Sequence, residues 1–110
     1  MSPIEEFFSL YFHEKENHVW VLTKEKTFRS FSGKNGVFSA VCFMNKELKN
    51  FRLNGVTLYC VLEPTLKEMG LLLLSRVDKV IFLKKTHLQD LSFLDRFLVH
   101  KLEREHYADK

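Results

Sequence analysis

Thr57–Leu83, TLYCVLEPTLKEMGLLLLSRVDKVIFL, indicates the fold of this chain more clearly than any other segment. Residues 56–62 form a continuous apolar run of the kind that makes a buried strand. A Glu-Pro pair breaks that run. Thr65-x-x-Glu68 then predicts a helix start, because each of these side chains can bond a free backbone amide of the first turn. A second apolar run, 79–83, follows the helix, so the two strands are predicted to be parallel and joined by a helical crossover.

The flanking sequence predicts further helices and strands. A capping serine, a proline and two acids at the N-terminus predict a first helix that fades by 16–17. The runs 18–23 and 26–32 predict a hairpin of two strands. Residues 37–49 and 65–76 both predict helices with apolar residues on two sides, and we expect both to pack on one face of the sheet.

The C-terminal part predicts a final amphipathic helix that ends in a charged tail, 101–110. Its apolar positions recur at helical spacing at Leu91, Leu94, Phe97, Leu98 and Leu102. The predicted order is therefore α-β-β-α-β-α-β-α. This order indicates a three-layer α/β/α sandwich with a mixed central sheet of four or five strands. The number stays open because the candidate fifth strand, 87–91, is short and polar.

The composition indicates one globular domain spanning 1–110. Of 110 residues, 45% are hydrophobic and 28% are charged, which is enough for one core. Eleven phenylalanines favour a core together with a protein-binding face. The formal net charge of +3 permits a weak nucleic-acid contact without requiring one. No apolar run is long enough to cross a bilayer and no signal-peptide pattern opens the chain, so we expect it in the cytoplasm, the nucleus or both.

Residues with catalytic or metal-binding chemistry show no functional spacing. Cys42 and Cys60 both lie inside apolar runs, which is typical of small buried side chains in a reducing compartment. The five histidines have no metal-ligand spacing. No Ser-His-Asp or Cys-His arrangement, glycine-rich phosphate loop or spaced carboxylate pair stands out. These patterns predict neither a cofactor nor a new enzymatic chemistry.

Four short segments carry a resemblance to a known family. They are Asn50–Leu53 (NFRL), Thr57–Pro64 (TLYCVLEP), Ser75–Val77 (SRV) and Val80–Phe82 (VIF). With the predicted element order, they resemble the cytidine-deaminase-like fold, and most closely the tRNA wobble-adenosine deaminases. The resemblance in sequence runs over residues 50–83 and is topological elsewhere.

The resemblance also places the family's zinc site on this chain. In that family one His and two Cys bind zinc, and a Glu acts as acid and base. The His and the Glu fall near Val37 and Ser39, and the two Cys fall on Thr65 and Glu68. The resemblance therefore implies that this chain lacks zinc and cannot deaminate by itself. Thr65 and Glu68 then serve as a helix cap, and a different metal on Glu68 is the less favoured alternative.

A fold without its active site resembles the non-catalytic subunit of the eukaryotic heterodimeric wobble deaminase. The implied partners are a catalytic deaminase subunit and tRNA. Apolar residues of the two central helices are the candidate interface: Phe38, Phe43, Met69, Leu71, Leu72 and Leu74. Candidate nucleic-acid contacts, also typical of a solvated face, are Lys84, Lys85, Lys101 and Arg104. The alternative is a free-standing inactive deaminase-fold module that binds a nucleotide, an RNA or another protein.

Overall fold

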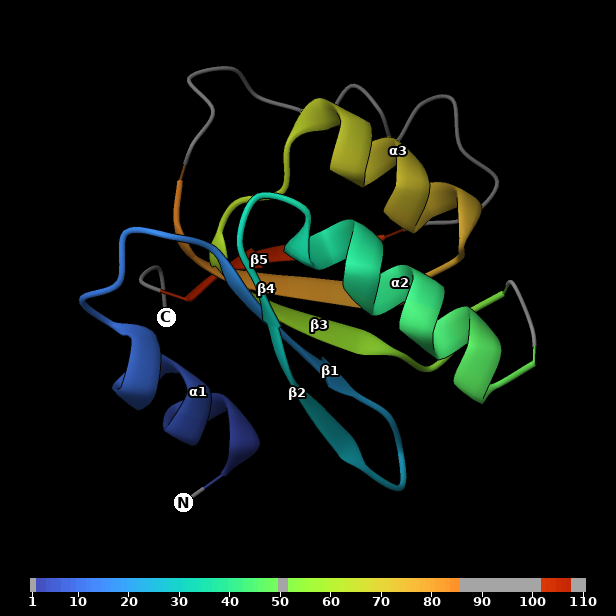
Figure 1. The fold of residues 1–110 in the computed structure, drawn as a ribbon, viewed down its shortest axis with the longest axis horizontal. Coiled ribbons are helices and arrows are strands. Elements are labelled where there is room, and N and C mark those ends of the chain that lie inside the picture. The colour runs from blue at the N-terminus through green and yellow to red at the C-terminus, as the bar shows by residue number, and fades with distance from the viewer. Residues whose placement is uncertain (1, 50–51, 86–101, 108–110) are drawn as a thin grey trace.

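A computed structural model describes residues 2–49, 52–85 and 102–107 of the chain. Its centre is a five-stranded mixed sheet with the strand order β2-β1-β3-β4-β5. Helices lie on both faces of the sheet (Figure 1). The elements are α1 (Pro3–Tyr11), β1 (His18–Leu22), β2 (Thr27–Ser32), α2 (Gly36–Glu47), β3 (Thr57–Leu62), α3 (Leu66–Leu74), β4 (Lys79–Lys84) and β5 (Glu103–His106). The predicted α/β sandwich with a mixed sheet is confirmed.

The two apolar runs of Thr57–Leu83 form the adjacent strands β3 and β4. They pair in parallel, with Leu58 beside Val80 and Cys60 beside Phe82. α3 connects them, as the crossover predicts. β1 pairs antiparallel with both β2 and β3, so the predicted hairpin joins the sheet through its first strand.

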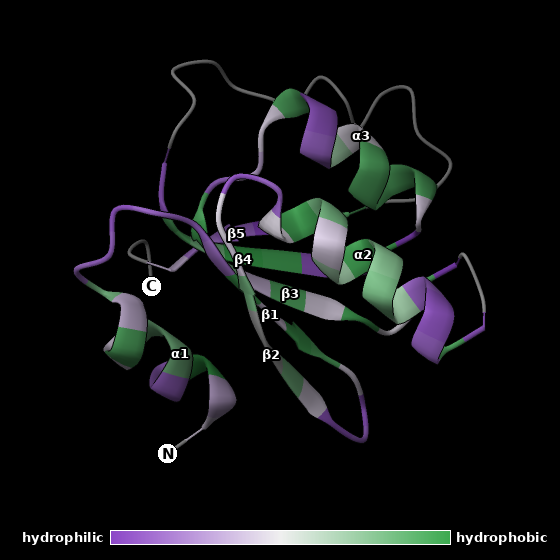
Figure 2. Cartoon of the chain, in the orientation of Figure 1, coloured by the Kyte–Doolittle hydropathy of each residue, from purple (hydrophilic) through white to green (hydrophobic). Residues whose placement is uncertain are grey.

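α2 and α3 cover one face of the sheet, as the two-sided apolar pattern predicts (Figure 1). Both are apolar over most of their length (Figure 2). Fully or almost fully buried residues of the core on this face include Val19, Val21, Val37, Val41, Met44, Leu58, Cys60, Met69, Leu72, Val80 and Phe82. This core holds the N-termini of both helices at one end of the sheet, close to the end of β3.

α1 covers the opposite face and places an aromatic cluster there. The Ser2 hydroxyl accepts a hydrogen bond from the Glu5 N–H at 3.4 Å, and Pro3 opens the first turn. Phe7 is buried, and its ring centroid lies 5.2 Å from that of Trp20. The helix ends at Tyr11, earlier than the predicted 16–17. The chain is already non-helical at Asn17, whose backbone carbonyl accepts the Gly33 N–H.

The charged C-terminal tail contains the fifth strand of the sheet, whereas the candidate fifth strand, 87–91, lies outside the described residues. Glu103–His106 pairs in parallel with β4, and the Lys79 ammonium contacts the Glu105 carboxylate at 2.8 Å. Leu102, predicted as the end of a helix, is buried in the core beside this strand. Most of the predicted final helix falls within 86–101, outside the described residues. The tail is a strand because it completes the open edge of β4.

Candidate functional site

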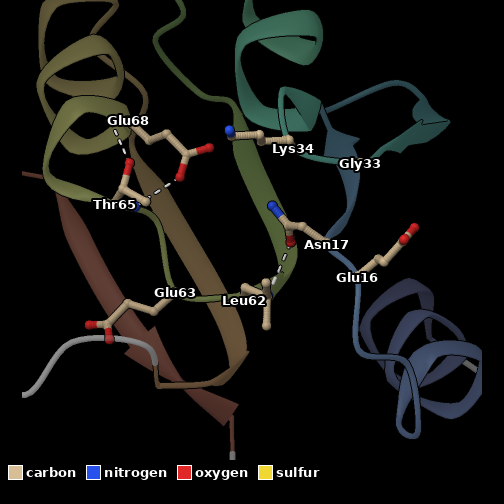
Figure 3. A pocket seen from close by; sticks show the side chains of 8 residues that line it. All are labelled: Glu16, Asn17, Gly33, Lys34, Leu62, Glu63, Thr65 and Glu68. Atoms are coloured by element: carbon tan, nitrogen blue, oxygen red, sulfur yellow. Dashed lines mark hydrogen bonds between the residues drawn. The ribbon is translucent and has the colours of Figure 1, made fainter.

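A cavity of about 390 Å³ lies where β3 ends and α3 begins. Residues from three parts of the chain line it (Figure 3). Glu16 and Asn17 precede β1, Gly33 and Lys34 precede α2, and the remainder, Leu62, Glu63, Thr65 and Glu68, follow the end of β3 into α3. The carboxyl ends of strands and the N-termini of helices are common ligand-binding places in α/β folds.

Thr65 and Glu68 close the first turn of α3 as a reciprocal cap. The Thr65 N–H donates to Glu68 Oε1 at 2.8 Å, and the Glu68 N–H donates to Thr65 Oγ1 at 3.3 Å. The capping box predicted from Thr65-x-x-Glu68 is therefore confirmed. Its two side chains also form one wall of the cavity.

Asn17 ties the neighbouring strands together beneath the cavity. Its side-chain Oδ1 accepts the Leu62 N–H at 3.1 Å, and its backbone carbonyl accepts the Gly33 N–H at 2.9 Å. The residue is only 9% exposed. The end of β3 and the segment after β2 are thus both hydrogen-bonded to one buried residue, Asn17.

Glu68 brings a buried carboxylate to this site. The Glu68 residue is 6% exposed. It lies in the first turn of α3, where the positive end of the helix dipole favours a negative charge. Burial, followed by the negative charge of Glu68, raises the pKa of the Cys60 thiol well above its usual range. Cys60 therefore stays a protonated thiol in the core near neutral pH.

The four positions that the resemblance assigns to the zinc chemistry do not fit a zinc site. Val37 is fully buried in the core and offers no ligand atom. Ser39 is exposed on α2, outside the residues that line the cavity. Thr65 and Glu68 do line the cavity, but they supply no Cys or His, and their cap bonds engage the hydroxyl and one carboxylate oxygen. Across residues 2–49, 52–85 and 102–107, no three His, Cys, Asp or Glu side chains form a metal-binding group.

The structure divides the candidate interface residues between the core and the surface. Met69 and Leu72 are buried in the chain's own core, and Leu71 packs partly against it. Phe43 lies against Phe28 and Phe31. The other two face solvent: Phe38 on α2 is 39% exposed and Leu74 at the end of α3 is 80% exposed.

Leu66 extends the exposed part of α3. It is 56% exposed and lies eight residues before Leu74, with the exposed Gly70 midway between them. Positions four apart share one side of a helix. α3 therefore presents an apolar outer stripe, defined here as Leu66, Gly70 and Leu74.

The structure describes three of the four candidate nucleic-acid residues, and these lie in different surroundings. The Lys84 ammonium donates to the Glu14 backbone carbonyl and is engaged within the chain. Lys85 is exposed just beyond β4. Arg104 lies on β5 beside Val80 and is partly buried. Lys101 lies outside the described residues.

The sequence did not point to Asn17 or Lys34 as parts of a site. Both lie in segments read as a helix end or as a cluster of breaker residues. Their positions could have indicated a site, because each lies within two residues of the start of a strand or helix. The strand order of the sheet then brings those element ends together. That order was not derivable from either segment alone.

Comparison with solved structures places this fold beside a tRNA deaminase. A structure from biochemical and structural studies of A-to-I editing by tRNA:A34 deaminases at the wobble position of transfer RNA matches with a TM-score of 0.70 and 14% identity. The match covers 84% of this chain and 79% of that one. No family model and no curated protein sequence matches the chain. The chain therefore has the deaminase-like fold of this neighbour, and the fold expected from the resemblance is confirmed.

None of the helices in the described part of the chain has the length and apolar character that a bilayer crossing requires.

Proposed function

We propose that this chain is the non-catalytic subunit of a heterodimeric tRNA adenosine deaminase that edits the wobble position. In this role it stabilises a catalytic deaminase subunit and assists tRNA binding. The proposal places the protein in the cytoplasm, the nucleus or both.

The observation that carries the proposal is the cap at the N-terminus of α3. On a deaminase-like fold, Thr65 and Glu68 take the positions that the resemblance assigns to two zinc-binding cysteines. Their bonds to each other's backbone stabilise the helix start without a metal. In the zinc deaminases, the metal supplies the hydroxide that attacks the adenine ring, and a site without zinc ligands cannot supply it in this way. In the proposed role, this chain contributes to editing by binding the catalytic deaminase subunit.

The outer stripe of α3 supports the association. Leu66 and Leu74 are exposed at 56% and 80%, although they belong to a helix that is apolar along most of its length (Figure 2). Phe38 on the neighbouring helix α2 adds a partly exposed aromatic ring. Exposed apolar side chains that lie together on a surface favour a subunit contact.

The test is purification of the chain alone and after co-expression with a catalytic deaminase subunit of the same organism. We expect stable co-purification, conversion of the wobble adenosine to inosine by the complex, and none by the chain alone. A control preparation of the catalytic subunit alone shows how much the second chain contributes. Inosine formed by this chain alone would contradict the proposal.

The cavity favours a second candidate function, a free-standing inactive deaminase-fold module that binds a nucleotide, an RNA or another protein. A space of about 390 Å³ beside buried polar groups is large enough for a small ligand. A chain that stays monomeric and does not bind the deaminase subunit in the co-expression experiment would favour this alternative.

A further inference from the structure

We draw no further inference here: the strongest candidate, a polar cavity of about 480 Å³ at the start of β3, β4 and β5 that is lined by Thr57, Asp78, Lys79 and Glu103, carries nothing because Lys79 already pairs with Glu103 and Asp78 already accepts the Gly55 N–H, and nothing in the structure points to a ligand there.

Discussion

Replacing Leu74 with aspartate separates the outer stripe of α3 from the core beneath the helix. Leu74 is 80% exposed, so a polar replacement removes little contact within the chain. An anion at the last helical residue opposes the helix dipole, which costs about 0.3–1 kcal/mol. We therefore expect the isolated Leu74→Asp chain to remain folded, with its free energy of unfolding lower by about 1 kcal/mol or less.

The effect on the proposed complex is larger. Burying a leucine at an interface contributes about 1.5–3 kcal/mol, most of which remains to be gained by a side chain as exposed as Leu74. An unpaired carboxylate there adds a desolvation cost. A loss of at least about 2 kcal/mol corresponds to an affinity roughly thirtyfold weaker. Co-purification with the deaminase subunit should therefore fail at concentrations where the unchanged chain binds.

Leu72→Ala is the matched control on the same helix. Leu72 is fully buried in the core, so its truncation should lower the free energy of unfolding by about 2–5 kcal/mol. While this variant stays folded, it should still bind the partner. Urea unfolding followed by circular dichroism measures the first quantity, and co-purification measures the second. Undiminished binding by Leu74→Asp, or loss of binding only where the chain has unfolded, would refute the interface.

Further measurements test the cap, the buried thiol and the zinc positions. Thr65→Ala removes the hydroxyl that accepts the Glu68 N–H, so urea unfolding should show a loss of about 1 kcal/mol; an unchanged midpoint would mean that this bond contributes nothing. Burial raises the pKa of the Cys60 thiol, so the folded state keeps a proton that the unfolded chain releases. The free energy of unfolding should then fall as pH rises above about 8.5, by up to about 1.4 kcal/mol per pH unit. Cys60→Ala should remove that slope between about pH 8.5 and 10. The same slope in both proteins would contradict this account. The double variant Thr65→Cys, Glu68→Cys should form no inosine in the absence of a partner, because Val37 and Ser39 supply neither the third ligand nor the acid and base. Inosine detected by mass spectrometry of the tRNA would show that these positions are misplaced.

The central elements were predictable from local sequence. Continuous apolar runs predicted β3 and β4 to within a residue, and the helix between them predicted their parallel pairing. The capping box at Thr65 and Glu68 was equally local, since its two partners are three residues apart. Local hydrogen bonding and hydrophobic periodicity decide such features before any distant contact forms.

β5 shows where local reasoning fails. Glu103–His106 is highly charged and has no apolar run, which is typical of a solvated tail. It becomes a strand because β4 offers an unpaired edge and because Lys79 lies close enough to pair with Glu105. Both reasons belong to residues more than twenty positions away, so they exist only once the sheet has formed.

The candidate site, like the fold, was predictable from local sequence only in part. The residue pattern was enough to predict that Thr65 and Glu68 cap a helix at the end of a buried strand, and it has no Cys or His at the positions named by the resemblance. By contrast, the place of Asn17 in the same cavity, and its bond to the Leu62 N–H 45 residues further along the chain, depend on the packed sheet. The antiparallel pairing of β1 with β3 brings the start of one strand to the end of the other. A cavity of this kind is defined by strand order, and strand order depends on long-range packing that no local pattern contains.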